Sequence, residues 1–158
     1  MAIARIIKKL QKVPPTKAQP EKQEDDDMEE LDELTTGGGD GNCIKKMMEA
    51  QQSIRMHHWL TSSHAEHKAL GKAYGGLDDL IDTFVETFIG AKGKGVLSGI
   101  SELSLHTEGD CMKVFDMLEE VLRNDIPKDV GDKETALLNI RDEILGLVQQ
   151  TKYLLNQD

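Results

Sequence analysis

Two histidines and two carboxylates form the pattern in this chain that is best suited to chemistry. His67 follows His58 by nine residues, and Asp82 and Glu86 follow His67 by fifteen and nineteen residues. Imidazole nitrogens and carboxylate oxygens are good ligands for iron and zinc. On a helix, Asp82 and Glu86 would share one face because they are four residues apart. The pattern predicts a metal site, and the alternative is that all four are ordinary polar residues of a helical bundle.

Two further residues extend this pattern more weakly. His64 and His67 are three residues apart, a spacing at which two imidazoles of a helix can share a metal, but no carboxylate follows either at the fourth position. Asp78, Asp82 and Glu86 form a stripe of like charge, which destabilises a bare helix by roughly 0.2–0.5 kcal/mol per pair. A cation or a basic partner would remove that cost. For Asp78 alone we prefer a solvated surface position.

The periodicity of apolar residues places the main candidate ligands on the first two of four expected helices. Asn42 is expected to cap the first helix, whose inner face includes His58. After a break at residues 61–63, Ser63 is expected to cap the second helix, with Glu66 at the third helical position as in a capping box. These two helices would therefore position the site.

The remaining elements complete an all-α fold. Gly75-Gly76 weakens the second helix by roughly 2 kcal/mol, so we expect a kink or a close helix contact there. A third helix is expected from about residue 108 to 124, ended by Pro127, and Asp132 is expected to cap a fourth. No stretch alternates with period two. The expected architecture is a four-helix bundle over residues 42–158.

Charge divides the chain near residue 41. Residues 1–22 carry six Lys or Arg and one acid, and residues 23–34 carry eight acids and no base. Apolar residues at helical spacing make residues 1–12 a basic amphipathic segment, and residues 13–41 read as a linker. We expect this tail to dock on a protein partner through residues 1–34. Nucleic acid, bound through residues 1–22, and a membrane surface are the alternatives.

The sequence has no apolar run long enough for a transmembrane helix, and its start lacks the features of a signal peptide. Cys43 and Cys111 are widely spaced and form no paired motif. They could form a bridge, but we expect two reduced thiols in a cytoplasmic protein, or in a virion if the chain is phage-encoded. From Asn42 onward there are nineteen acids and thirteen bases. A body of that sign has no general attraction for nucleic acid.

The order of these motifs resembles that of the mini-ferritins, the DNA-binding proteins from starved cells. In that family a His-Trp pair ends the first helix, and a second histidine lies fifteen residues before the aspartate of an Asp-x-x-x-Glu motif. His58-Trp59, His67 and the segment from Asp82 to Glu86 match this order. The resemblance implies a ferritin-like bundle that self-associates and oxidises ferrous iron. It implies shared sites, with both histidines from one subunit, both carboxylates from its neighbour, and Trp59 at the contact.

The chain departs from the mini-ferritin pattern at three places. The segment between the histidines is three residues shorter, Gly71 stands where the family often has an acidic ligand, and Thr87 stands where it has arginine. A missing acid lowers the affinity for iron, and zinc or manganese would be the other candidate metals. Overall the chain looks closer to uncharacterised small helical proteins encoded by bacteriophages. A second interpretation is therefore a non-enzymatic interaction protein or virion-associated protein that docks through its charged tail.

Overall fold

The computed structural model describes residues 41–157 and is built there from helices and their connections, without a β-strand. In chain order the elements are α1 (Asn42–Leu60), α2 (His64–Lys92), the 3-10 helix η3 (Lys94–Leu97), α3 (Met112–Glu120), the π-helical turn η4 (Val121–Asp125), α4 (Ile126–Val130) and α5 (Thr135–Leu155). The expected all-α fold is confirmed for this part of the chain. The predictions for residues 1–40 lie outside the described residues.

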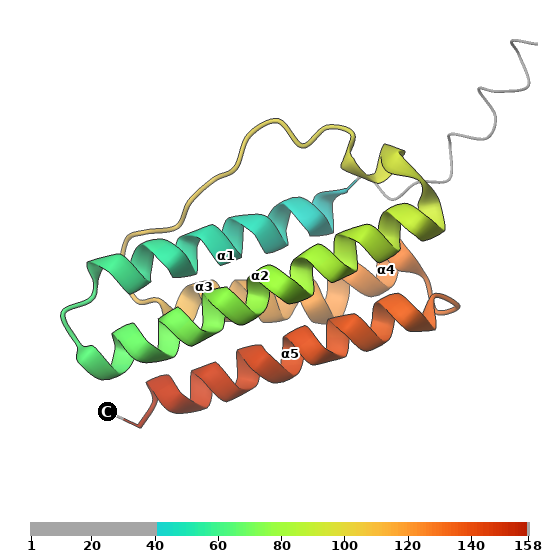
Figure 1. The fold of residues 1–158 in the computed structure, drawn as a ribbon. Coiled ribbons are helices and arrows are strands. Elements are labelled where there is room, and N and C mark those ends of the chain that lie inside the picture. The colour runs from blue at the N-terminus through green and yellow to red at the C-terminus, as the bar shows by residue number, and fades with distance from the viewer. Residues whose placement is uncertain (1–40, 158) are drawn as a thin grey trace, which may run out of the picture. The chain divides into compact units, whose positions relative to one another are not determined.

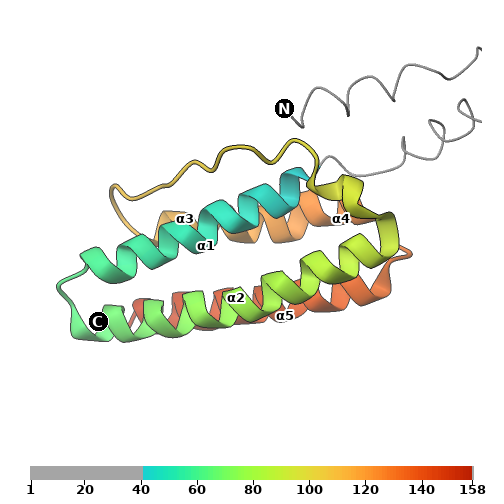
Figure 2. The ribbon, with the colours of Figure 1, turned by 45° about the horizontal axis from the view of Figure 1, so that its top comes forward.

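The helices of residues 41–157 lie side by side as rods, with α3, η4 and α4 following one another in a single rod (Figure 1). α2 packs against α1 and α5, and α3 also packs against α1 and α5. Figure 2 gives a second view, in which the C-terminal ends of α1 and α5 lie at the same end as the start of α2. This end therefore carries the connection between α1 and α2, where the two predicted histidine ligands lie.

The rods enclose one apolar core because each presents apolar side chains at every third or fourth position. Phe84 and Phe88 of α2 are fully buried, with ring centroids 5.7 Å apart in an edge-to-face arrangement. Burial of a side chain of this size stabilises the fold by roughly 1.5–3 kcal/mol. Within the described residues, no helix combines the length and apolar character needed to cross a membrane.

Gly41, and not Asn42, is the N-cap residue of α1, so the predicted cap is wrong by one position. Gly41 has a φ of 67°, in the left-handed region that favours glycine. A Cβ at Gly41 would lie 2.0 Å from the carbonyl oxygen of Val96. The start of α1 therefore lies directly against η3, and only a residue without a side chain permits this approach.

At the start of α2, one of the two hydrogen bonds of the predicted capping box is formed. Ser63 Oγ accepts a hydrogen bond from Glu66 N at 3.2 Å, which confirms Ser63 as the cap. The Glu66 carboxylate does not return to the Ser63 N–H, which instead donates to Thr61 Oγ1 at 3.1 Å. The carboxylate accepts from the Thr61 hydroxyl and from the Cys111 thiol. Glu66 thus ties the start of α2 to the start of α3.

The rod formed by α3, η4 and α4 begins and ends later than the third helix that the sequence predicts. It starts at Met112 and continues through Pro127 to Val130. Ile126 N donates to the carbonyl of Val121, five residues earlier, which is the π-helical spacing. This wider turn accommodates the proline, which has no N–H and clashes with the carbonyl four residues before it in a regular α-helix. The predicted stop at the proline is therefore wrong.

The fourth predicted helix corresponds to α5, but it begins at Thr135 with Glu134 as its N-cap residue. Asp132 lies in the turn before it, so the predicted cap is wrong. Gly76 confirms the expected close helix contact, since a Cβ there would lie 2.9 Å from Cδ2 of Leu147 in α5. α2 is continuous through this position.

Candidate functional site

His58 and His67 form a stacked pair where α1 ends and α2 begins. Their ring centroids are 3.8 Å apart and the ring planes are inclined by 22°. His58 Nδ1 lies 2.8 Å from the carbonyl oxygen of His67, and His67 Nδ1 lies 2.9 Å from the carbonyl oxygen of His58. Because a carbonyl oxygen only accepts, both Nδ1 atoms donate, and a neutral ring then keeps its lone pair on Nε2. Two reciprocal hydrogen bonds close this turn.

Tyr74 and Gly71 lie against the ring of His58, and Arg55 packs on Tyr74. Tyr74 meets the ring edge-on, with centroids 5.2 Å apart, and the guanidinium of Arg55 lies 4.8 Å from the centre of the Tyr74 ring. At Gly71 a Cβ would lie 3.0 Å from Cε1 of His58. Gly71 is one of the departures from the mini-ferritin pattern. It has a local reason, since the absent side chain leaves room for the His58 ring.

His57, and not His58, lies on the buried face of α1, so the predicted inner face is wrong at its last position. His57 is 7% exposed, while His58 is partly exposed. His57 Nε2 donates to the carbonyl oxygen of His106 at 3.0 Å. On a helix, the next buried residue after Ile54 can lie three or four positions later. In α1 it lies three positions later, at His57. The sequence alone did not distinguish these two steps.

Asp82 and Glu86 lie on the exposed face of α2, far along the helix from the histidines. At 1.5 Å per residue, fifteen residues separate His67 from Asp82 by about 22 Å. Asp78 is also exposed, and its Oδ1 accepts a hydrogen bond at 2.6 Å from Nε2 of the buried Gln51. Asp78 therefore links α2 to α1, a role that its charge stripe did not indicate.

The described residues of one chain contain no group of three or more His, Cys, Asp or Glu side chains placed to hold a metal ion. His64 is exposed at the first position of α2. The stacked rings of His58 and His67 lie in nearly parallel planes. An ion bound in the plane of both rings would therefore lie well beyond the ~2 Å length of an imidazole–metal bond. The metal site stays a prediction, and it needs ligands from a second copy.

Residues 101–107, which we call the strap, run without regular secondary structure along α1 (Figure 1). Ser104 N donates to Oε1 of Glu49 at 2.8 Å, and His106 N donates to Oγ of Ser53 at 2.9 Å. These two acceptors and the donor His57 lie four residues apart on one face of α1. The sequence showed only a connection here, because polar residues at this spacing read equally well as a solvated face.

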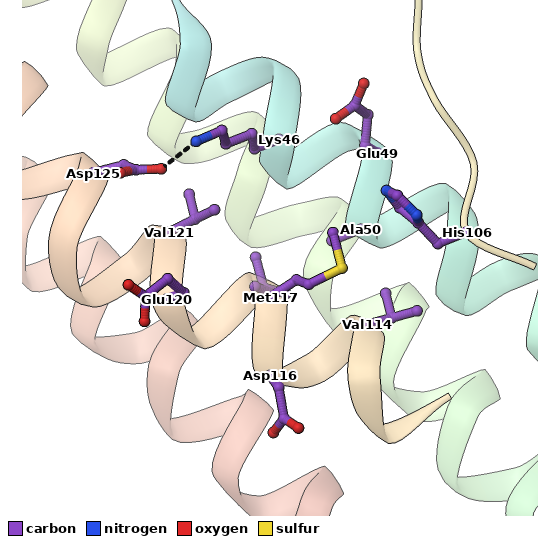
Figure 3. Close-up of a pocket in the computed structure, with 11 residues that line it drawn as sticks. Lys46, Glu49, Ala50, His106, Val114, Asp116, Met117, Glu120, Val121 and Asp125 are labelled. Carbon is purple, nitrogen blue, oxygen red and sulfur yellow. Dashed lines mark hydrogen bonds and ion pairs between the residues drawn. The ribbon is translucent and has the colours of Figure 1, made fainter. Parts of the chain in front are cut away.

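A cavity of about 480 Å³, which we call the α1–α3 groove, opens between α1 and the rod of α3 and η4 (Figure 3). Figure 3 shows Met117 reaching toward Ala50, and Nζ of Lys46 lies 2.7 Å from Oδ2 of Asp125. The sequence did not predict this groove, because its two walls are far apart along the chain. The lining residues are Lys46, Glu49, Ala50, His106, Val114, Asp116, Met117, Leu118, Glu120, Val121 and Asp125.

Four large apolar side chains are exposed at the end where α1 and α5 finish, and we call them the end surface. Trp59 and Leu60 close α1 and are each 63% exposed, while Tyr153 and Leu154 of α5 are 61% and 41% exposed. Both views place these two helix ends at the same end of residues 41–157 (Figures 1 and 2). Large apolar side chains exposed at the ends of helices are typical of interaction sites.

Both cysteines are free and buried, and neither thiol is activated. Burial, and next the neighbouring Asp129, raise the pKa of Cys43. Burial, and next the hydrogen bond to Glu66, raise the pKa of Cys111 to about 12. The thiolate is the reactive form of cysteine, so neither residue is placed to act as a nucleophile.

Comparisons with known proteins agree with the resemblance of the sequence to small helical proteins encoded by bacteriophages. Residues 58–155 match a family of unknown function, DUF5856. The chain is also similar to an uncharacterized 14.6 kDa protein encoded in the mobD–ri intergenic region of Enterobacteria phage T4. The two are 33% identical over 110 residues, which cover 70% of this chain and 82% of that protein. No solved structure matches the chain.

Proposed function

The chain belongs to the DUF5856 family, and from this premise we propose that it is a phage-encoded, non-enzymatic helical interaction protein that docks through its end surface. The observation that carries the proposal is the exposure of Trp59, Leu60, Tyr153 and Leu154 at one end of residues 41–157. Trp and Tyr are enriched in the buried centres of protein interfaces and dominate their binding energy. Leaving them in water forgoes roughly 25 cal/mol for each Å² of apolar area.

A second copy of the chain is the partner to test first. A two-fold contact uses the same patch on both subunits, so one surface with aromatic anchors is sufficient for a dimer. The end surface has this composition, with an aromatic residue on each of two helices. Self-association of this kind also agrees with the homo-oligomer that the resemblance to the mini-ferritins implies.

Trp59 provides a direct reporter because it is the only tryptophan in the chain. Light scattering over a range of protein concentrations measures the mass, and the emission of Trp59 measures whether its ring leaves water. We expect a concentration-dependent increase in mass together with a blue shift and reduced quenching by acrylamide. The variant Tyr153→Ser should weaken association at least tenfold while leaving the tryptophan in place.

Leu97→Ser is the matched control, because Leu97 is 39% exposed and lies in η3, outside the end surface. It should associate like the wild-type protein. A protein that stays monomeric at every concentration, with Trp59 still accessible to acrylamide, contradicts self-association. An equal effect of both serine variants would mean that the end surface is not the contact.

Metal binding at His58 and His67 is the second candidate function. The favouring observation is that both Nδ1 atoms donate to backbone carbonyls, which leaves Nε2 of each neutral ring as an electron-pair donor. Ligating histidines in proteins are oriented by the same kind of hydrogen bond. Because one ion cannot lie in the planes of both stacked rings, one of the two rings would offer its Nε2 to a site completed by Asp82 and Glu86 of a neighbouring copy.

One chain alone does not fit the metal, since its candidate ligands do not meet within the described residues. The test is an anaerobic ferrous iron titration of the wild-type protein beside the double variant Asp82→Ala/Glu86→Ala, followed by the admission of oxygen. Saturable binding that the double variant loses, with rapid oxidation, supports a mini-ferritin-like ferroxidase. Zinc and manganese titrations distinguish iron from the other two metals. Equal background binding by both proteins would rule out this candidate.

A further inference from the structure

We propose that the strap pairs with the strap of a second copy of the chain, as a two-stranded antiparallel ribbon centred on Ser104. The strap shares no residue with the end surface, so the inference does not depend on the proposed function. Its evidence is the extended backbone of the strap, its open outer edge and the symmetric order of its side chains.

The backbone of the strap is extended along its whole length, without a turn or a bend. The amides of Ser104 and His106 both donate to side chains of α1, and the carbonyl oxygen of His106 accepts from His57. Hydrogen bonds from every second residue toward the same side are the pattern of a β-strand, whose intervening residues point to the other edge. α1 therefore occupies the inner edge of the strap.

The outer edge of the strap is open. By the same alternation, Leu103 and Leu105 direct their N–H and C=O groups away from α1. Among the residues that the structure describes, these groups have no hydrogen-bond partner. In both views the strap is the outermost segment of residues 41–157 on its side of α1 (Figures 1 and 2). The two leucines are 37% and 47% exposed. An exposed strand edge of this kind is a template for pairing with another chain.

The order of side chains in the strap selects a second copy as the partner. Residues at equal distances before and after Ser104 are of complementary kinds: leucine with leucine, then glutamate with histidine, then serine with threonine. A two-fold axis at Ser104 would place Leu103 opposite Leu105 of the second copy. It would also place Glu102 opposite His106, both exposed, and the imidazole can donate a hydrogen bond to the carboxylate. A parallel ribbon in register would instead set Glu102 beside Glu102.

The same register satisfies the open edge. Leu103 and Leu105 of the second copy would form a hydrogen-bonded pair, in which the N–H of each residue donates to the C=O of the other. The two-fold axis repeats this pair, so every outward backbone group of both leucines is bonded. Ser104 would face its own counterpart in a non-hydrogen-bonded pair, where the two Cα atoms lie about 4.5 Å apart.

Disulfide cross-linking of the full-length protein tests this register. A Cα separation of about 4.5 Å is within the range that a disulfide spans, so Ser104→Cys should link two copies under mild oxidation. Cys43 and Cys111 are buried, and the wild-type protein gives the background rate. We expect Ser104→Cys to form a linked dimer at least tenfold faster than the wild-type protein, as measured by non-reducing electrophoresis.

Glu102→Cys is the matched control within the strap. In the proposed register the two copies of residue 102 lie four residues apart along the ribbon, about 14 Å, which no disulfide spans. It should therefore not cross-link to itself, whereas a mixture of Glu102→Cys with His106→Cys should form the mixed dimer. If Glu102→Cys alone cross-links as fast as Ser104→Cys, or if the mixture gives no mixed dimer, the proposal is wrong.

A second substitution in the Ser104→Cys protein tests the contact between leucines. Leu105→Asp would place a carboxylate beside Leu103 of the second copy, and it should slow cross-linking at least tenfold. Leu97→Asp is its matched control, because Leu97 is an exposed leucine of η3 outside the strap and the change in charge is the same. This control should leave the rate unchanged. Equal rates in the two aspartate variants would overturn the proposal.

Discussion

Replacing His67 by alanine should destabilise the protein, because it removes one of the two reciprocal hydrogen bonds and the ring stacking that join α1 to α2. The substitution removes the hydrogen bond from His67 Nδ1 to the carbonyl oxygen of His58, a distance of 2.9 Å, and the ring that stacks 3.8 Å from His58. The second hydrogen bond, from His58 Nδ1, survives because it ends on the backbone of residue 67.

The magnitude follows from these contacts. A hydrogen bond of this kind contributes roughly 0.5–1.5 kcal/mol, and a stacked ring pair a further roughly 0.5–1.5 kcal/mol. Alanine has a higher helix propensity than histidine, which offsets about half a kcal/mol of this loss in the free energy of unfolding. His67 is exposed, so no cavity cost is added. We therefore expect His67→Ala to lower the free energy of unfolding by about 1–2 kcal/mol.

Urea unfolding followed by circular dichroism measures this change, with His64→Ala as the matched control. His64 is an exposed histidine of the same helix, one turn earlier, outside the stacked pair. The control variant should be as stable as the wild-type protein or slightly more stable. If His67→Ala is no less stable than His64→Ala, the stacked pair contributes nothing and the reasoning is refuted.

Three further predictions concern single residues. Hydrogen bonds from Lys152, and next from Arg123, lower the pKa of Glu119 from 4.5 to about 2, so stability present above pH 4.5 is lost toward pH 2. Between pH 4.5 and pH 2, the free energy of unfolding of Glu119→Gln should fall by about 1 kcal/mol less than that of the wild-type protein. An equal fall in both proteins, measured by unfolding at several pH values, contradicts the ion pairs. Gly41→Ala should cost roughly 2 kcal/mol or more in urea unfolding, because of its positive φ and the nearby carbonyl, and a neutral effect is the opposing result. Cys111 should react slowly with a thiol reagent at pH 8, and Glu66→Gln should speed the reaction, while equal rates would exclude the carboxylate as a cause.

The fold class and the turn between α1 and α2 could be predicted from the sequence because both depend on local signals. Apolar spacing indicated helices, and Ser63 with Glu66 indicated the start of α2. The end of the third rod could not be predicted, because Pro127 is accommodated by a π-helical turn whose extra residue leaves no recognisable sequence pattern.

The candidate site could be predicted only in part. The sequence placed the two histidines on either side of a short break between two helices, and in the structure a three-residue turn brings their rings together. Their engagement with each other's backbone could not be foreseen, since it depends on ring orientation and on the space left by Gly71. The α1–α3 groove depends on the packing of distant helices, and one sequence contains no signal for it.

The strap bears on how the molecule opens locally. Among the described residues, its backbone is hydrogen-bonded to α1 through the amides of Ser104 and His106 and the carbonyl of His106, all bonded to side chains. Such a segment can detach while the helices stay folded, because few contacts must break. In hydrogen exchange these two amides should therefore exchange far sooner than the core amides of α2. Their exchange rates should also change little with denaturant concentration. The strap is then a separate, weakly cooperative unit within an otherwise cooperative fold.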